Sequence, residues 1–289
     1  MTDLDRLPEP EPDDGLYEIY SLCFARGPER RVHRNFVLRD MHDAPMPIDY
    51  NLWILRNRHR TILVDTGFGE RAAAERGRPL DFDPLDGLSR IGIPPETIRH
   101  VILSHLHYDH AGNIDRLSAA HFHIQDAEVA FATGRCMCAE IGRLPFDVED
   151  VTQFIRHTYA DRVTFHLGEA APFPGISLHL LPGHSKGVQG VLVQTRRGPV
   201  LLASDVSHFF ANFLNRAPFI LTIDSRETLA SYARMQELAG GPEFIIPGHD
   251  PKVRHYYPVI RVNGVALNTL HVPPAPHDLA EYASYGGPA

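Results

Sequence analysis

Three histidines and one aspartate follow directly after a short apolar run. The run Val101–Ser104 has the composition of a buried strand and leads straight into His105, His107, Asp109 and His110. If the strand continues into the motif, the first two histidines point to the same face, because alternate residues of a strand do so. The last two residues then lie where the chain turns toward a helix, so their side chains diverge. The stretch therefore predicts ligands for two neighbouring cations.

Three further apolar runs are each followed by one residue whose side chain can bind a metal ion. These residues are His184, Asp205 and His249. Two divalent cations about 3.5 to 4 Å apart repel each other unless an anion lies between them, so the set must include a further carboxylate. Sites of α/β proteins form at the carboxyl ends of strands. We therefore expect these three residues to join the first four.

The order of the expected elements indicates a layered α/β sandwich. The β-rich runs Tyr50–Asn57 and Thr61–Gly69 are separated by an Arg-His-Arg turn, which predicts a hairpin. The best amphipathic helix covers Ser225–Gly241, with Ser225 as its N-cap and glycines at its end. Strands come in two batches, each followed by helices, which is the order expected of such a sandwich.

Chain length and composition favour one domain with a tail at each end. With 289 residues, 43% of them hydrophobic, the chain can bury a sizeable core. We expect a flexible acidic tail over residues 1–15, a single domain over residues 16–270 and a C-terminal tail over residues 271–289.

Charge and hydropathy argue against several classes of protein. The net charge of −8 and the lack of a Lys and Arg cluster disfavour a nucleic-acid partner. The N-terminus is acidic, unlike a secretory signal, and no segment approaches the ~20 apolar residues that span a bilayer. Three cysteines supply no disulfide framework. We therefore expect a cytoplasmic protein that binds neither nucleic acid nor membrane.

The motifs SHLHYDH, PGHS, ASD and PGHD, preceded by LVDTG, resemble those of the metallo-β-lactamase superfamily. The resemblance covers about residues 50–250 and implies the four-layer αββα sandwich of that family. It implies that His105, His107 and His184 hold one metal ion. It implies that Asp109, His110 and His249 hold the other, and that Asp205 bridges the two.

The resemblance also concerns the surroundings and the identity of the metal ions. Asp65, in VDTG, is similar to a residue that supports the metal ligands from behind, where an ordinary turn aspartate is the alternative. Two zinc ions (Zn2+) are the default for imidazole and carboxylate donors, and iron, manganese and cobalt accept the same donors.

The charge of such a centre predicts its chemistry. Two divalent cations, two carboxylates and neutral imidazoles leave a net positive charge, and metal coordination lowers the pKa of a bound water from about 15.7 to about 7. A hydroxide is then available at neutral pH, and a metal can polarise a carbonyl oxygen and stabilise the alkoxide that forms on attack. This predicts hydrolysis of an ester, lactone, thioester or amide.

Within the superfamily, the chain is similar to N-acyl homoserine lactone lactonases in SHLHYDHAGN, LLASDVSHFFANF and PEFIIPGHD. Those enzymes usually carry a tyrosine three residues after the bridging aspartate, where this chain has His208. The difference makes the chain similar also to small-ring lactonases of the 4-pyridoxolactonase type. The resemblance implies a dinuclear metal-dependent hydrolase that opens a small lactone ring by attack of a metal-bridging hydroxide.

Other hydrolytic substrates stay open. Hydroxyacylglutathione hydrolases share all seven ligands but typically add a basic and aromatic C-terminal region, of which DPKVRHYYPVIRV is a faint version. True β-lactamases usually lack an aspartate at the position of Asp205. Another ester, a thioester or a cyclic amide therefore remains an alternative to a lactone.

Two residues are predicted to move protons. Asp109 stands beside the hydroxide and can pass its proton to the leaving oxygen. His208 follows Asp205 by one short turn, so it can lean over the open face and donate to the carbonyl oxygen or to the leaving alkoxide. The alternative for His208 is a histidine that points to solvent.

The substrate pocket is the least constrained part of the site. Tyr108, Phe209, Phe210 and Phe213 could wall a pocket for an apolar or aromatic group, with core packing as the alternative for the phenylalanines. Residues 30–50 are longer and more polar than an edge strand needs. A lid and a homodimer contact are the two roles left open for them.

Overall fold

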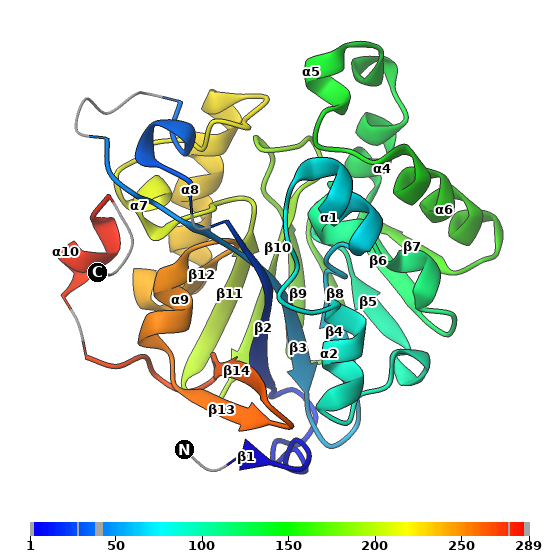
Figure 1. Cartoon of the computed structure of the whole chain (residues 1–289), viewed down its shortest axis with the longest axis vertical. Helices are drawn as coiled ribbons and strands as arrows, with labels where there is room; N and C mark the ends of the chain where they lie inside the picture. Colours follow the sequence, from blue (N-terminus) through cyan, green and yellow to red (C-terminus); the bar gives the residue numbers. More distant parts are fainter. Residues whose placement is uncertain (1–2, 28, 38–42, 277, 286–289) are drawn as a thin grey trace.

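Two β-sheets pack face to face at the centre of the molecule, and helices cover their outer faces (Figure 1). The computed structural model describes residues 3–27, 29–37, 43–276 and 278–285. Helices α1, α2, α4 and α6 lie on one side and α7, α8 and α9 on the other (Figure 1). The expected four-layer αββα sandwich is confirmed.

The larger sheet has nine strands in the order β1-β13-β14-β2-β3-β4-β5-β6-β7. The expected hairpin is confirmed, because β3 and β4 pair antiparallel with Trp53 opposite Val64. From β4 to β7 each strand is parallel to its neighbour, so their carboxyl ends lie at one edge. The strands are β1 (Asp3–Leu4), β2 (Glu18–Gly27), β3 (Ile48–Arg56), β4 (Thr61–Val64), β5 (His100–Ile102), β6 (His121–Gln125), β7 (Val163–His166), β13 (Val259–Val262) and β14 (Val265–Thr269).

The smaller sheet has five strands in the order β12-β11-β10-β9-β8. It is antiparallel from β8 to β11, and β12 runs parallel to β11, so both of these end at the same edge. The strands are β8 (Ala170–Phe173), β9 (Ile176–Leu180), β10 (Gln189–Thr195), β11 (Gly198–Ser204) and β12 (Ile245–Pro247).

Helix α8 is the long amphipathic helix expected from the sequence, but its cap lies one residue earlier. The Asp224 carboxylate accepts hydrogen bonds from the backbone N–H groups of Arg226 and Glu227, at 2.9 and 3.0 Å. Ser225 is thus the first helical residue, and Gly240 ends the helix at a φ of 77°. None of the described helices has the length and apolar composition needed to cross a membrane.

The remaining elements are helices. The α-helices are α1 (Glu70–Arg76), α2 (Pro84–Arg90), α3 (Tyr108–Ala111), α4 (Asp126–Ala132), α5 (Glu140–Arg143), α6 (Val148–Tyr159), α7 (Phe210–Leu214), α8 (Ser225–Ala239), α9 (Pro251–Tyr256) and α10 (Leu279–Ala283). Short 3-10 helices cover Val32–Arg34, Pro95–Thr97, Ile114–Arg116, Arg135–Cys138 and Pro242–Phe244.

The alternation of side chains along the central strands builds a core on each side of the larger sheet. Trp53 and Val64 face the smaller sheet and pack in one buried cluster with Leu202. Leu52 and Leu63, one residue earlier on the same strands, belong to a second cluster on the opposite face. The first cluster holds the two sheets together.

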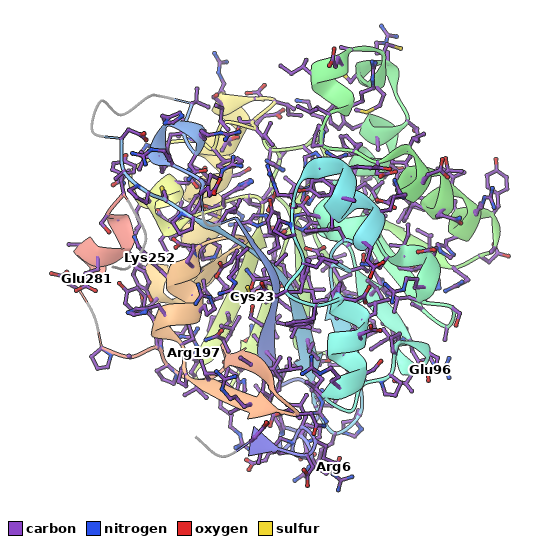
Figure 2. The ribbon with its side chains drawn as sticks, viewed as in Figure 1. Arg6, Cys23, Glu96, Arg197, Lys252 and Glu281 are labelled. Carbon is purple, nitrogen blue, oxygen red and sulfur yellow. The ribbon has the colours of Figure 1, made fainter. Side chains whose placement is uncertain are left out.

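The packed domain extends into both segments expected to be tails. At the N-terminal end, β1 pairs with β13 and Leu7 is buried. At the C-terminal end, the Tyr282 ring stacks on Phe210 with centroids 4.0 Å apart. The Lys252 ammonium of α9 donates at 3.1 Å to the carbonyl of Tyr282, a residue of α10 (Figure 2). Of the segment 30–50, residues 38–42 lie outside the described residues.

Candidate metal centre and active site

The seven expected ligands meet at one edge of the sandwich, where strands of both sheets end. Strand β5 ends at Ile102, so His105 and His107 follow in an extended loop rather than inside the strand. Their rings are nevertheless neighbours, with centroids 4.3 Å apart. The smaller sheet supplies the other residues, from the β9–β10 loop and from the ends of β11 and β12: His184, Asp205 and His249.

Asp205 lies at the centre of the cluster, and its two oxygens face different histidines. Oδ2 is 3.1 Å from Nε2 of His184 and 3.7 Å from Nε2 of His105. Oδ1 is 2.8 Å from Nε2 of His249 and 3.3 Å from Nε2 of His110. One carboxylate therefore stands between two separate groups of imidazoles.

The possible ligand atoms fall into the two groups that the family resemblance implies. One group is His105, His107, His184 and Asp205, and the other is Asp109, His110 and His249; within each, the ligand atoms lie within 4.8 Å of one another. A third combination, Asp205 with His208 and His249, meets the same limit.

The donor atoms suit divalent cations. Nε2 of His105 is buried and has no hydrogen-bond partner in the described part of the chain, and the nearest oxygen of Asp205 is 3.7 Å away. Polar atoms left in this way are costly unless something binds them. Because imidazole nitrogen and carboxylate oxygen are ligands of zinc, the residues present fit such ions.

The protonation of the group around His105 also suits cation binding, whereas around His110 and His249 burial is outweighed by the charges of Asp205 and Asp109, which raise the pKa of both rings. Burial, together with the neighbouring histidines, holds the pKa of His105 and of His107 well below its usual value. Burial alone would raise the pKa of Asp205, but the surrounding histidines hold it well below its usual value. Neutral imidazoles and an ionised carboxylate are the forms that bind metals.

Asp65, at the end of β4, lies directly behind the cluster. Its Oδ2 is 2.8 Å from Nδ1 of His110, the ring nitrogen that faces away from Asp205. The backbone N–H of Ser104 donates to its Oδ1 at 2.7 Å. Asp65 is fully buried and has a φ of 62°, a left-handed conformation that non-glycine residues adopt at a cost. The fold therefore fixes this carboxylate tightly against His110.

Glu128, a residue that the sequence analysis missed, connects the two loops that carry histidine ligands. Its buried carboxylate accepts hydrogen bonds from the N–H of Leu106, the N–H of Gly187 and the hydroxyl of Ser185. A Cβ on Gly187 would lie 2.1 Å from the Glu128 backbone nitrogen, so only glycine permits this approach. The one signal in the sequence is an acidic residue among the apolar residues that follow Asp126 in helix α4.

His208 is buried against the cluster and does not point to solvent. Its side chain is 4% exposed, and Nε2 is 3.2 Å from Oδ2 of Asp205. The ring stacks on Phe219 with centroids 3.4 Å apart. His208 thus lies at the wall of the site, as one of the two expectations had it.

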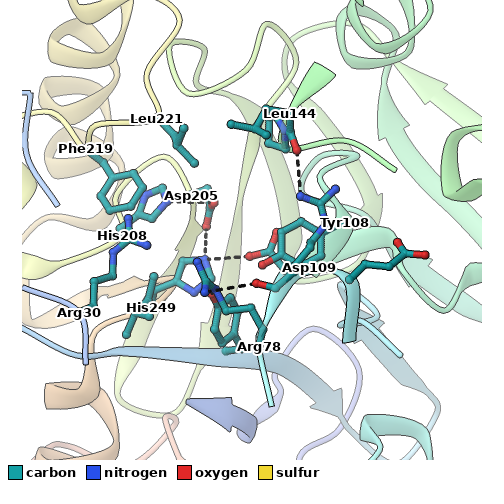
Figure 3. Close-up of a pocket in the computed structure, with 15 residues that line it drawn as sticks. Arg30, Arg78, Tyr108, Asp109, Leu144, Asp205, His208, Phe219, Leu221 and His249 are labelled. Carbon is teal, nitrogen blue, oxygen red and sulfur yellow. Dashed lines mark hydrogen bonds and ion pairs between the residues drawn. The ribbon is translucent and has the colours of Figure 1, made fainter. Parts of the chain in front are cut away.

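A cavity of about 540 Å³ opens onto the cluster (Figure 3). Its lining includes residues at the cluster and the expected Tyr108: Asp109, Asp205, His208, His249 and Tyr108. The expectation for the phenylalanines after Asp205 is corrected. Helix α7 turns Phe210 and Phe213 into the core between the sheets, and Phe209 is buried in a neighbouring apolar cluster. Phe219, Leu221 and three arginines line the cavity instead, and no motif in the sequence marks them.

Comparison with known proteins gives the cluster a context. An N-acyl homoserine lactonase of Bacillus sp. is 29% identical over 223 residues, which cover 70% of this chain and 82% of that protein. The lactonase AttM of Rhizobium johnstonii is 30% identical over 181 residues, 60% of this chain and 66% of that one. A crystal structure of a quorum-quenching N-acyl homoserine lactone lactonase superposes with a TM-score of 0.69 at 25% identity, covering 83% of this chain and 95% of that one.

The family itself follows from a match over most of the chain. The model of the Metallo-beta-lactamase superfamily matches residues 46–249, a range that contains all seven ligand residues and both sheets' strand ends at the site. With that match and this αββα sandwich, the chain belongs to the metallo-β-lactamase superfamily.

Proposed function

We propose that the protein is a dinuclear metal-dependent lactonase that hydrolyses a small lactone ring. The observation that carries this proposal is the placement of Asp205, whose two carboxylate oxygens each face a different group of histidines. One carboxylate between two ligand sets is what a pair of cations needs to lie close together. Similarity to N-acyl homoserine lactonases supports a lactone as the substrate.

Each ligand group would hold one divalent ion, with zinc as the expected metal. Asp205 would belong to both groups, which are formed by His105, His107 and His184 and by Asp109, His110 and His249. When bound, such ions lower the pKa of a water molecule and polarise a carbonyl oxygen. The surrounding residues prepare the ligands, since Asp65 fixes the ring of His110 and the Asp49 carbonyl accepts from Nδ1 of His249 at 2.7 Å.

Asp109 is the residue we assign to proton transfer. Its side chain is 11% exposed and lines the cavity, whereas Asp205 is 3% exposed and surrounded by histidines. Asp109 can therefore take the proton of the attacking water and deliver it to the oxygen that leaves the opened ring.

We assign His208 to hydrogen bonding with the carbonyl oxygen of the substrate. Its ring reaches both Asp205 and the cavity, so a lactone lying over the cluster comes within reach of the imidazole. A hydrogen bond from this ring to the carbonyl oxygen strengthens as negative charge develops there. Phe219 stacks on the face of the imidazole and keeps it in this orientation.

A metal analysis and a substrate panel test the proposal. We expect about two metal ions per chain, and kcat/KM should be highest for lactones in a panel of acyl homoserine lactones, aromatic lactones, hydroxyacylglutathione thioesters and cyclic amides. Faster hydrolysis of a thioester or cyclic amide than of every lactone would replace the lactonase assignment. One metal ion or none per active chain would contradict the dinuclear centre.

A further inference from the structure

Three arginines line the cavity beside the candidate metal centre: Arg76, Arg30 and Arg78. Figure 3 shows the last two. They stand out because the whole chain carries a net charge of −8. The cavity's carboxylates do not neutralise them. Asp109 and Asp205 belong to the ligand cluster, and Glu75 pairs with Arg71 at 3.3 Å.

Arg76 has a structural explanation. Its guanidinium donates to the carbonyls of Leu144 and Phe146, at 2.8 and 2.9 Å, and lies 4.0 Å from the centroid of the Tyr108 ring. These contacts attach the segment before α6 to helix α1. Arg76 therefore needs no ligand to account for its position.

Arg30 lies on the His208 side of the cavity. Its guanidinium carbon is 5.1 Å from the centroid of Phe219, the ring that stacks on His208. Its hydrogen bonds go to the Asn35 amide oxygen and, at 2.9 Å, to the Arg34 carbonyl, both uncharged groups. Burial partly removes the Arg30 charge from water and so lowers the pKa of Arg30 from its usual value.

Arg78 lies on the His249 side of the cavity. Its Nε donates to the Tyr50 hydroxyl at 3.0 Å, and the Tyr50 ring meets the ring of His249 edge-on with centroids 5.4 Å apart. In the described part of the chain, no carboxylate lies within 4.0 Å of the side-chain nitrogens of Arg30 or Arg78. One aromatic ring thus lies between Arg78 and the candidate ligand His249, and another lies between Arg30 and His208.

We propose that Arg30 and Arg78 bind an anionic group, a carboxylate in the simplest case, on the part of the substrate that extends away from the scissile ester. Partly buried charges without a counter-charge are unfavourable, and a bound anion offsets that cost. The planar guanidinium matches a carboxylate through two parallel hydrogen bonds. The inference rests on the proposed lactonase function and narrows its substrate class to lactones that carry a negative charge.

Two lactones that differ only in charge test this inference. γ-Butyrolactone is neutral, and 5-oxotetrahydrofuran-3-carboxylate is the same ring with a carboxylate. We expect the metal-loaded enzyme to hydrolyse the charged ring with a kcat/KM at least about tenfold higher, the value of one charge-assisted hydrogen bond. Arg30→Gln and Arg78→Gln should each remove about tenfold of that preference through KM, with little change for the neutral ring.

Arg226→Gln is the matched control. Arg226 is exposed on α8, so this substitution removes the same charge at a distance from the cavity. It should leave the preference unchanged. An equal kcat/KM for the two rings would overturn the inference, as would a preference that survives in the double variant.

A binding measurement separates this inference from the proposed function. We expect the metal-loaded protein to bind succinate more tightly than butyrate in calorimetry, and Arg30→Gln to reduce that difference. This outcome would support the anion site even if neither lactone were hydrolysed. A failure to hydrolyse both lactones would count against the lactonase assignment alone. Equal binding of the two acids would overturn the anion site.

Discussion

The imidazole of His208 and the ring of Phe219 lie face to face, with centroids 3.4 Å apart and planes 14° apart. Phe219 is itself buried and belongs to an apolar cluster, so it cannot turn freely. The stack leaves His208 with Nε2 3.2 Å from Asp205 and its edge at the cavity. The ring is therefore held in one orientation beside the position where a substrate would lie.

Replacing His208 tests this role. His208→Phe should keep both metal ions and lose about 10²- to 10³-fold in turnover, the usual contribution of one hydrogen-bond donor to a developing oxyanion. His208→Tyr, which keeps a donor, should retain part of the activity. Metal content and kcat are the measurements. A large loss of metal in His208→Phe would instead make His208 a ligand, and a parent rate would leave it without a chemical role.

Removing a shared ligand tests the centre itself. Asp205→Ala should lower both metal content and turnover to near background, because both oxygens that face the two histidine groups are lost. His107→Ala should lower metal content too, but it leaves the other group intact. Asp115→Ala, at an exposed position, is the control. Full metal occupancy with a normal rate in either ligand variant would refute the site.

Asp109→Asn separates chemistry from binding. The amide keeps the size of the side chain but cannot accept the proton of the attacking water. We expect kcat to fall far more than the apparent substrate affinity, as for an interaction made in the transition state. Steady-state kinetics at equal metal content measure the effect. A change in KM alone would exclude proton transfer by Asp109.

The buried carboxylate of Glu128 should contribute to stability as well as to the site. Glu128→Gln exchanges one acceptor oxygen for an NH₂ group that faces backbone N–H donors, which should lower the free energy of unfolding by about 1–3 kcal/mol. Urea unfolding, with exposed Glu140→Gln as the control, measures the change. An unchanged midpoint would show that these hydrogen bonds are dispensable for holding the two histidine loops.

Asp150 gives a prediction for pH. Burial, with the nearby Asp147 charge, raises the pKa of Asp150 from 3.8 to about 7. The folded protein then keeps a proton that the unfolded chain releases, so stability falls as the pH rises from about 4 to 7. Asp150→Asn should therefore raise the free energy of unfolding by about 1–3 kcal/mol at pH 8, with little effect at pH 4.

Thermal or urea unfolding at the two pH values checks this result. Glu149→Gln, its exposed neighbour on α6, should show no such difference. An equal change for Asp150→Asn at both pH values would mean that its carboxyl does not titrate in this window.

The positions of the candidate ligands were predictable because each follows a strand that an apolar run in the sequence predicts. Asp205 and His249 end apolar runs, and strands that end at one edge bring distant residues together. Although β5 ends at Ile102, three residues before His105, the loop still places His105 beside His107.

The cavity wall was not predictable in the same way, since it depends on the path of the chain between elements. The helix after Asp205 directs Phe213 into the core, and the loop beyond it returns Phe219 to His208. Nothing in residue type distinguishes these two phenylalanines. Arg30 and Arg78 reach the same cavity from separate loops, and no spacing in the sequence relates them.

The ligand residues divide between the two sheets, and this division has a consequence for unfolding. His105 and Asp109 follow a strand of the larger sheet, whereas Asp205 and His249 follow strands of the smaller one. An ion held by both sets binds only while the two sheets are docked, so its binding free energy adds to the free energy that keeps them together. The ions of the proposed centre should therefore make the two sheets harder to separate, and a chelator should lower the free energy of unfolding.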